Sequence, residues 1–219
     1  MDPLLSQLGL MEYNKSRPVS YKFGNHTLDV LVTGLGMVAT TLSLSRKLKE
    51  KQYDLVLDIG IAGGYHSHIP LGEIGIVSEE VFADFGAENN SKFLSVFELG
   101  LIDENAFPFT GGKLVNPYLD KEPLLLSLKR MKGATLNCVS GSFKDAAAIA
   151  GKFNVDVETM EGAAFFYVCL TEKLPFLEFR AISNYAGDRD HRNWEIDLSL
   201  KALADAVIEY LRKLETYGT

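Results

Sequence analysis

Short apolar runs along this chain switch between the two-residue period typical of strands and the 3.6-residue period typical of helices. The predicted strands span residues 19–23, 27–33, 54–60, 74–78, 134–140 and 176–182. The predicted helices span residues 36–50, 118–132, 144–153, 165–170 and 195–216. Because strands alternate with helices, we predict an α/β fold with a mixed, largely parallel central sheet flanked by helices.

The chain does not open with the apolar strand that begins most single-domain α/β proteins. Residues 1–10 are polar and weakly helical, so we expect either that a first strand is absent or that the native protein starts upstream of Met1. The length of 219 residues predicts one domain over 1–219. An aromatic stretch interrupted by glycine and proline at 89–117 predicts a long functional loop.

Composition and charge narrow the classes of partner. A net charge of −7 and a pI of about 5.2 argue against nucleic acids and anionic membranes. No apolar run reaches the ~18 residues that span a bilayer, and no signal peptide is visible. Cys138 and Cys169 stand far apart without metal-ligand spacing. We therefore expect two buried free thiols, a cytoplasmic protein and no metal site.

The stretch from Val155 to Asp190 combines acids, an apolar helix and a strand with a polar end. Glu161 precedes Gly-Ala-Ala at the start of the helix, where a carboxylate meets the positive end of the helix dipole. Ser183 and Asn184 follow the strand predicted at 176–182. Ligands in α/β proteins bind outside the carboxyl ends of strands, so we expect Glu161 and Asn184 to be neighbours in one pocket.

Six motifs are spread over nearly the whole chain: TGLG at 33–36, DIGIAGG at 58–64, LGEIG at 71–75, VSGSF at 139–143, MEGAA at 160–164 and RAISN at 180–184. No single glycine motif is specific, but in this order and spacing they resemble the nucleoside phosphorylase and nucleosidase superfamily. Two further segments, ADFGAE at 83–88 and SNYAGDRD at 183–190, resemble its futalosine hydrolase branch.

The resemblance implies a phosphorylase-type three-layer fold, no cofactor, and a homodimer or higher homo-oligomer. It implies that the partner is a small-molecule purine nucleoside whose N-glycosidic bond is cleaved. In the futalosine hydrolase branch this reaction releases hypoxanthine from futalosine during menaquinone biosynthesis. The transition state has a cationic ribosyl group and an anionic departing base, so the enzyme must stabilise both charges.

At the sugar, the resemblance assigns Glu161 to the ribose hydroxyls and Met160 to the ribose face. Arg180 would help to place water and sugar, and Ala62 and Gly63 would let the backbone lie against the ribosyl group. The structural alternatives are a helix-capping role for Glu161, a core position for Met160, and an ion pair of Arg180 with Glu158 or another acid.

At the base, Phe143 would stack on the purine while backbone groups from Ser142 to Lys144 read its edge. Asn184 would hydrogen-bond the base. Related nucleosidases that cleave 6-aminopurines have an aspartic acid there, which protonates N7; asparagine transfers no proton and fits a 6-oxopurine. Arg189 and Lys144, with Arg192 and His191, are candidates for the carboxylate of the substrate's side arm.

Water is the favoured nucleophile. Phosphorylases place an arginine where Ser78-Glu79-Glu80 stands here, and carboxylates repel phosphate. Three alternatives remain open: a purine nucleoside phosphorylase, a methylthioadenosine/adenosylhomocysteine nucleosidase, and an inactive nucleoside-binding protein. The residue that activates water is not identified, because the nucleosidases place it near the end of the first strand.

Overall fold

The computed structural model describes residues 19–90, 92–125 and 127–217, so the helical segment predicted at 1–10 lies outside the described part. The strands are β1 (Val19–Phe23), β2 (His26–Val30), β3 (Val56–Gly64), β4 (Ile74–Phe82), β5 (Gly86–Asn89), β6 (Lys92–Ser95), β7 (Leu114–Val115), β8 (Lys129–Thr135), β9 (Val157–Thr159) and β10 (Phe176–Tyr185). The helices are α2 (Met37–Leu48), α3 (Phe143–Phe153), α4 (Gly162–Thr171) and α5 (Ile196–Tyr217).

The central sheet is mixed, as predicted. Its strand order is β10-β3-β9-β8-β4-β7, and a further pairing of β10 with β4 closes five of the strands into a ring. The pairs β10–β3, β4–β8 and β8–β9 are parallel, whereas β3–β9, β10–β4 and β4–β7 are antiparallel. The remaining strands form the hairpins β1–β2 and β5–β6, the first turning at Gly24-Asn25 as the sequence indicates.

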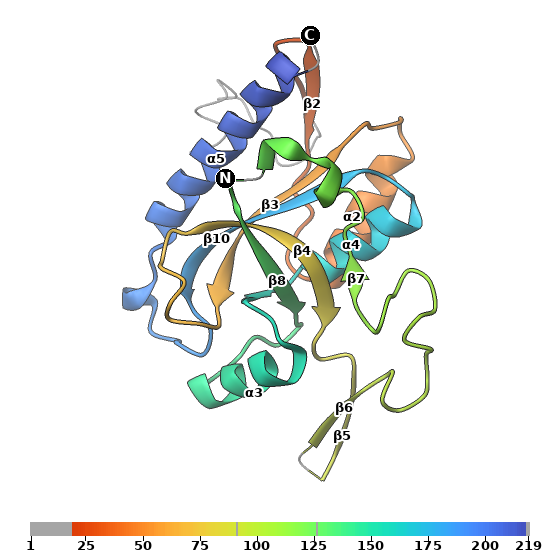
Figure 1. The fold of residues 1–219 in the computed structure, drawn as a ribbon, viewed down its shortest axis with the longest axis vertical. Coiled ribbons are helices and arrows are strands. Elements are labelled where there is room, and N and C mark those ends of the chain that lie inside the picture. The colour runs from red at the N-terminus through yellow and green to blue at the C-terminus, as the bar shows by residue number, and fades with distance from the viewer. Residues whose placement is uncertain (1–18, 91, 126, 218–219) are drawn as a thin grey trace.

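Helices cover both sides of the sheet, which confirms the predicted α/β layering. Figure 1 shows α5 along one side, with α2 and α4 on the other. On β10, the odd-numbered Leu177 and Phe179 pack in the core cluster that contains α5 residues. The even-numbered Phe176 and Ile182 pack with Phe166 of α4. Because side chains alternate along a strand, the even positions between them, 178 and 180, face the α4 side.

The α-helix predicted around Pro123 is wrong. Residues 118–132 form no α-helix; they contain the 3-10 segments Leu119–Lys121 and Pro123–Leu125 and then the start of β8. The helix-like spacing of leucines arises because Leu119 and Leu125 are buried in the core cluster with α5. Pro123 lacks the N–H that a continuous α-helix would need.

The strand predicted at 134–140 lies five residues earlier, at Lys129–Thr135. Cys138 therefore falls beyond its end and is exposed, which corrects the prediction that it is buried; Cys169 is buried in α4 as expected. The predicted loop at 89–117 is partly ordered by the β5–β6 hairpin and by β7.

Within residues 19–90, 92–125 and 127–217, the helices all lack the combination of length and apolarity that crossing a bilayer requires.

Candidate active site

Glu161 stands at the junction of β9 and α4 and is held by a neighbouring backbone. It is the N-cap residue of α4, but its side chain makes no capping hydrogen bond to its own helix. Its Oε1 instead accepts a 2.7 Å hydrogen bond from the N–H of Gly36, the N-cap residue of α2. Gly36 has φ +84°, a backbone conformation that favours glycine. Glu161 therefore forms no side-chain hydrogen bond to its own helix and is held by the start of α2 instead.

Arg180 is a buried cation between carboxylates. Its side chain is 3% exposed, its Nε donates a 2.7 Å hydrogen bond to Glu178 Oε1, and its Nη2 forms an ion pair with Asp58. These carboxylates raise the pKa of the Arg180 guanidinium, although burial opposes this. Glu158, the partner that the sequence suggested, instead accepts hydrogen bonds from Ser140 and from the hydroxyl of Tyr65.

Glu161 and Arg180 line the same cavity. Its volume is about 790 Å³, and it runs between β2 with its continuation to Gly34 on one side and β3 on the other. Asp58 also lines it, and side chains of α5 form part of its wall. Asp58, Glu161 and Arg180 bring charged groups to its wall, where a sugar hydroxyl could bind. The other residues predicted for the site do not line this cavity: Ala62, Gly63, Ser142, Phe143, Lys144, Met160, Asn184 and Arg189.

Asn184 lies on the same strand as Arg180, four residues closer to its carboxyl end. In the parallel β3–β10 pair, Arg180 is the partner of Gly60 and Asn184 the partner of Gly63. Its Nδ2 donates to the carbonyl of Tyr185 at 3.2 Å, and its Oδ1 accepts from the hydroxyl of Ser183 at 2.9 Å. A carbonyl only accepts, so this contact fixes the orientation of the amide and leaves one N–H to donate to a base.

Ala62 and Gly63 provide the backbone beside Asn184. Ala62 is buried, and its carbonyl accepts a hydrogen bond from the hydroxyl of Ser183. A Cβ on Gly63 would lie 3.5 Å from Asn184 Nδ2. Met160 is half-buried and directly precedes Glu161. About 10 Å of strand separates Gly60 from Gly63, which fits one ribosyl group and its base.

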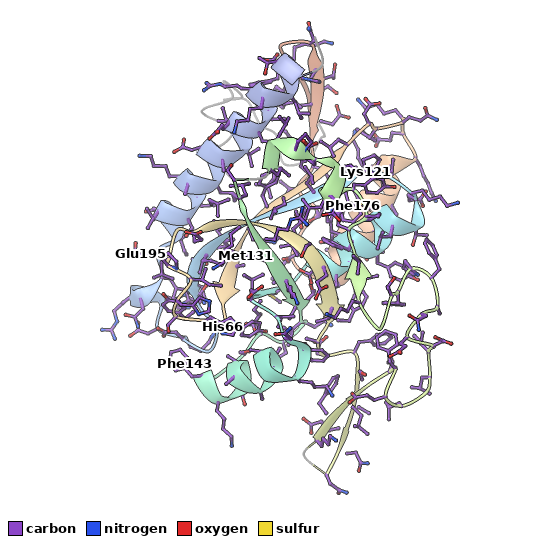
Figure 2. All side chains as sticks on the ribbon, viewed as in Figure 1. His66, Lys121, Met131, Phe143, Phe176 and Glu195 are labelled. Carbon is purple, nitrogen blue, oxygen red and sulfur yellow. The ribbon has the colours of Figure 1, made fainter. Side chains whose placement is uncertain are left out.

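Phe143 and Ser142 are held near Asn184 by the loop after β10. A Cβ on Gly187 would lie 2.4 Å from the carbonyl carbon of Ser142 and 2.5 Å from the N of Phe143, so these backbones are in close contact. Ser142 is the N-cap residue of α3, and its hydroxyl accepts from the N–H of Asp145. Phe143 is 63% exposed and lies at the start of α3, at the lower left of the molecule in Figure 2. An aromatic ring left exposed here is available for stacking.

The cations predicted to bind the carboxylate of the substrate's side arm lie on the surface and do not line the cavity. Lys144 and Arg189 are exposed, and Arg189 lies over the ring of Trp194 at 5.5 Å. Arg192 is paired with Asp190. Lys144 and Arg189 flank the Phe143 region through α3 and the Gly187 loop, whereas Arg192 already has a carboxylate partner.

Three acids near Arg180 were not predicted to belong to its surroundings: the half-buried Asp58 and the fully buried Glu80 and Glu178. Each interrupts an otherwise apolar strand, at LVLDIGI, SEEVF and FLEFR. A charge in the middle of a central strand is rarely buried without a partner, so these positions already signalled a polar interior. Among the described residues, no group of three or more His, Cys, Asp and Glu side chains has an arrangement suited to a metal ion.

Comparison with known proteins gives a consistent result. The family model described as the phosphorylase superfamily matches residues 11–216. A futalosine hydrolase of Thermus thermophilus is 36% identical over 181 residues, which cover 81% of this chain and 78% of the relative. A 5'-methylthioadenosine/S-adenosylhomocysteine nucleosidase of Haemophilus ducreyi is 27% identical over 215 residues, covering 91% of this chain and 85% of the relative.

Solved structures share the fold. A futalosine hydrolase mutant of Helicobacter pylori superposes with a TM-score of 0.78 at 18% identity, covering 96% of this chain and 93% of the other. The methylthioadenosine/adenosylhomocysteine nucleosidase of the same organism superposes with a TM-score of 0.75 at 17% identity, covering 96% and 92%. At these identities the superpositions confirm the predicted phosphorylase-type fold.

The buried position of Arg180 leads to a stability prediction. Arg180→Gln should lower the free energy of unfolding by about 3–5 kcal/mol, because it leaves the buried Glu178 without a cation. Arg192→Gln removes an arginine of an exposed pair, whose side chain is 88% accessible, and should cause no measurable change. Urea unfolding of both variants tests this, and equal effects would contradict the buried pairing.

Proposed function

Because the chain belongs to the phosphorylase superfamily, we propose that it is a purine nucleosidase that hydrolyses the N-glycosidic bond of futalosine and releases hypoxanthine. The observation that carries this proposal is that Glu161 and Arg180 line one cavity. Glu161 is held there by the hydrogen bond from Gly36 and interacts electrostatically with Arg180. The similarity to futalosine hydrolases supports the choice of substrate.

Glu161 would stabilise the ribosyl cation. A carboxylate at the ribose hydroxyls accepts their hydrogen bonds and favours positive charge on the ring. The hydrogen bond from Gly36 uses Oε1 and holds the side chain in place, while Oε2 stays available for a ribose hydroxyl. Arg180, fixed by Glu178 and Asp58, would orient the sugar and the water from the same cavity.

Asn184 would select the base. One of its amide hydrogens is bound to Tyr185, and the other can donate to N7 as negative charge develops on the purine. An amide gives no proton, so this site suits a base that leaves without full protonation at N7. Hypoxanthine, a 6-oxopurine, fits this requirement better than adenine.

Two features favour water over phosphate as the nucleophile. The N–H of Gly36, which could have contributed to an anion site, is already occupied by the Glu161 carboxylate. Glu80 points into the interior, whereas Glu79 pairs with Lys113 and Lys132 on the other face of β4. At this point of β4 an incoming phosphate would therefore meet no arginine, and the two lysines nearby are already paired with Glu79.

The first test is release of base from futalosine, inosine and methylthioadenosine, each with and without phosphate. Futalosine should give hypoxanthine and a free sugar at a rate independent of phosphate. Glu161→Gln should lower kcat/KM by at least about 100-fold, since it removes a charge that acts in the transition state. Glu50→Gln, an exposed acid on the surface, should retain the wild-type rate.

Three results would contradict the proposal in different ways. Dependence on phosphate would indicate a phosphorylase. Preference for methylthioadenosine would indicate the other nucleosidase class. No cleavage of any of the three nucleosides, with retained binding, would indicate an inactive nucleoside-binding protein.

The second test addresses base selection. Asn184→Asp should increase the relative kcat/KM for a 6-aminopurine nucleoside over a 6-oxopurine nucleoside. The new carboxyl would face the carbonyl of Tyr185, which disfavours its ionised form, so a proton becomes available for N7. Ratios of kcat/KM for adenosine-type and inosine-type substrates measure the change, and an unaltered ratio would remove Asn184 from base recognition.

We also propose that two copies of the chain pair through α2. Leu35, Val38 and Leu42 are 77%, 80% and 50% exposed and lie on and just before this helix, next to Gly36. A second copy would bury these side chains close to the Glu161 end of the site.

Val38→Lys should shift the protein toward the monomer in sedimentation velocity, because it places a charge in an apolar interface. Lys49→Glu, which changes an exposed charge at the end of the same helix, should leave the assembly unchanged. A monomeric wild type, or a Val38→Lys variant that assembles like the wild type, would contradict pairing through α2.

A further inference from the structure

Two fully buried acids face each other behind the site. Glu80 on β4 and Glu178 on β10 are both 0% exposed. A Cβ on Gly162 would lie 2.3 Å from Glu80 Oε1 and 2.7 Å from Glu178 Oε1, so the two carboxyl groups meet across the first residue of α4. Gly133 leaves similar room on β8, because a Cβ there would lie 1.9 Å from Glu80 Oε1. Glycine at both positions makes space for the pair.

Each of these acids has one oxygen without a hydrogen-bond partner. Only four buried side-chain polar atoms lack a partner in the described part of the chain, and two of them are Glu80 Oε1 and Glu178 Oε2. A buried oxygen without a hydrogen-bond partner destabilises the folded protein. Two such oxygens on adjacent acids can both be satisfied by one hydrogen bond between them. A single proton placed between the carboxyl groups gives one of them a donor and the other an acceptor.

The charges around the pair also require a proton. Arg180 is the cation that contacts the cluster, whereas Asp58, Glu161 and Glu178 are acids that act on it together with Glu80. The titratable groups that face the pair from the surrounding elements are Asp58, Tyr65, Glu161, Cys169 and Arg180. One cation does not neutralise four buried or half-buried carboxylates, so the most buried unpaired one is the group that stays neutral.

We propose that Glu80 remains protonated and donates a hydrogen bond to Glu178, whose ionised carboxylate in turn holds Arg180 in position. Glu80 and Glu178 are then positioning residues that act through Arg180. This inference rests on the proposed nucleosidase function for its kinetic consequence but not for the location of the proton.

The hydrogen bonds around the two acids assign the proton to Glu80. Glu178 Oε1 accepts from Arg180 Nε at 2.7 Å, which favours its ionised form. Glu80 Oε2 accepts from the hydroxyl of Thr135 at 2.8 Å, and that hydroxyl itself accepts from the N–H of Ala163. Glu80 thus has a neutral donor on one oxygen and no cation, which leaves Oε1 to hold the proton.

The pKa directions agree with this arrangement. Burial raises the pKa of Glu80 well above its ordinary value, and the neighbouring Glu178 raises it further. Burial also raises the pKa of Glu178, but Arg180 opposes that rise. Because the folded state favours the protonated form of Glu80, the stability that this group contributes is full at low pH and is lost as pH rises above the ordinary glutamate value toward the raised one.

The location of the proton can be tested without substrate. At pH 8 the infrared spectrum of the wild type should show the C=O stretch of a protonated carboxylic acid, and Glu80→Gln should lack it. Glu80→Gln should also raise Tm relative to the wild type by about 2–4 °C at pH 8 and by less at pH 5. A wild type without the acid band at pH 8 overturns the proposal, and this result does not depend on whether the variant folds.

The positioning role needs a kinetic test. Glu178→Gln should lower kcat by about 10- to 100-fold, which corresponds to losing a charged hydrogen bond, with a smaller change in KM. Glu79→Gln, at the next position to Glu80 on β4 but on its outer face, should leave both parameters unchanged. A Glu178→Gln enzyme with wild-type kcat would overturn the positioning role.

The two proposals fail in different ways. If the wild type shows the acid band but cleaves no nucleoside, the proposed function is wrong and the protonated pair stands. If it cleaves futalosine without the acid band, the function stands and the pair is wrong.

Discussion

The guanidinium of Arg180 is the charge on which the polar interior of this sheet depends. A carboxylate such as Glu178, with no exposed surface, is unfavourable inside a protein unless a cation or a proton neutralises it. Arg180 provides that neutralisation for Glu178 and Asp58 at once, from the centre of the longest strand of the sheet. The same group lines the cavity together with Glu161, so one side chain both neutralises the interior and borders the proposed site.

Room for this cluster is created by residues without side chains. Gly60, Gly133 and Gly162 each border an ionisable group so closely that a methyl group would collide with Arg180, Glu80 or both buried acids. Glycine within a strand or helix lowers the stability of that element relative to alanine. At these positions the loss is tolerated because a side chain would collide with the ionisable groups. In the GIAGG motif Gly60 thus leaves space for the Arg180 guanidinium, and in the EGAA motif Gly162 leaves space for the two buried acids.

Much of the fold follows from periodicity, and the exceptions have physical causes. The strands around Asp58, Ile74 and Phe179 and the helices α2, α3, α4 and α5 were predictable because each has a clear apolar period. The region before β8 was not, since its leucines pack against α5 from short 3-10 turns with the spacing that a helix would show. The pairing of β10 with β4, which closes the sheet, could not be predicted from the sequence either, because no local pattern encodes which strands pair.

The positions of Glu161 at the start of α4 and of Asn184 near the end of β10 were predictable from their motifs, but Glu161 lines the cavity and Asn184 does not, so one shared pocket stays a prediction. The partners of Arg180 were not, because ion pairing across strands depends on register: Asp58 is opposite Glu178, two residues before the arginine. Glu158 was the partner suggested for Arg180 from the sequence, but it lies in β9 and accepts a hydrogen bond from Ser140 instead. The roles predicted for the site residues in catalysis and binding, those of Glu161, Arg180 and Asn184 included, stay predictions.

The cavity beside β3 gives this strand an unusual mechanical position. Along Val56–Ala62 it is hydrogen-bonded to β10 on one edge, while its pairing with β9 is confined to Gly63 and Gly64. Among the described residues this part of β3 has a strand partner on one edge only, and a strand with fewer backbone hydrogen bonds opens locally at lower free energy. Asp58, which pairs with Arg180, and Ala62, whose backbone we propose to lie against the sugar, thus share one strand, so a local opening of β3 would disturb the ion pair and the proposed sugar site together.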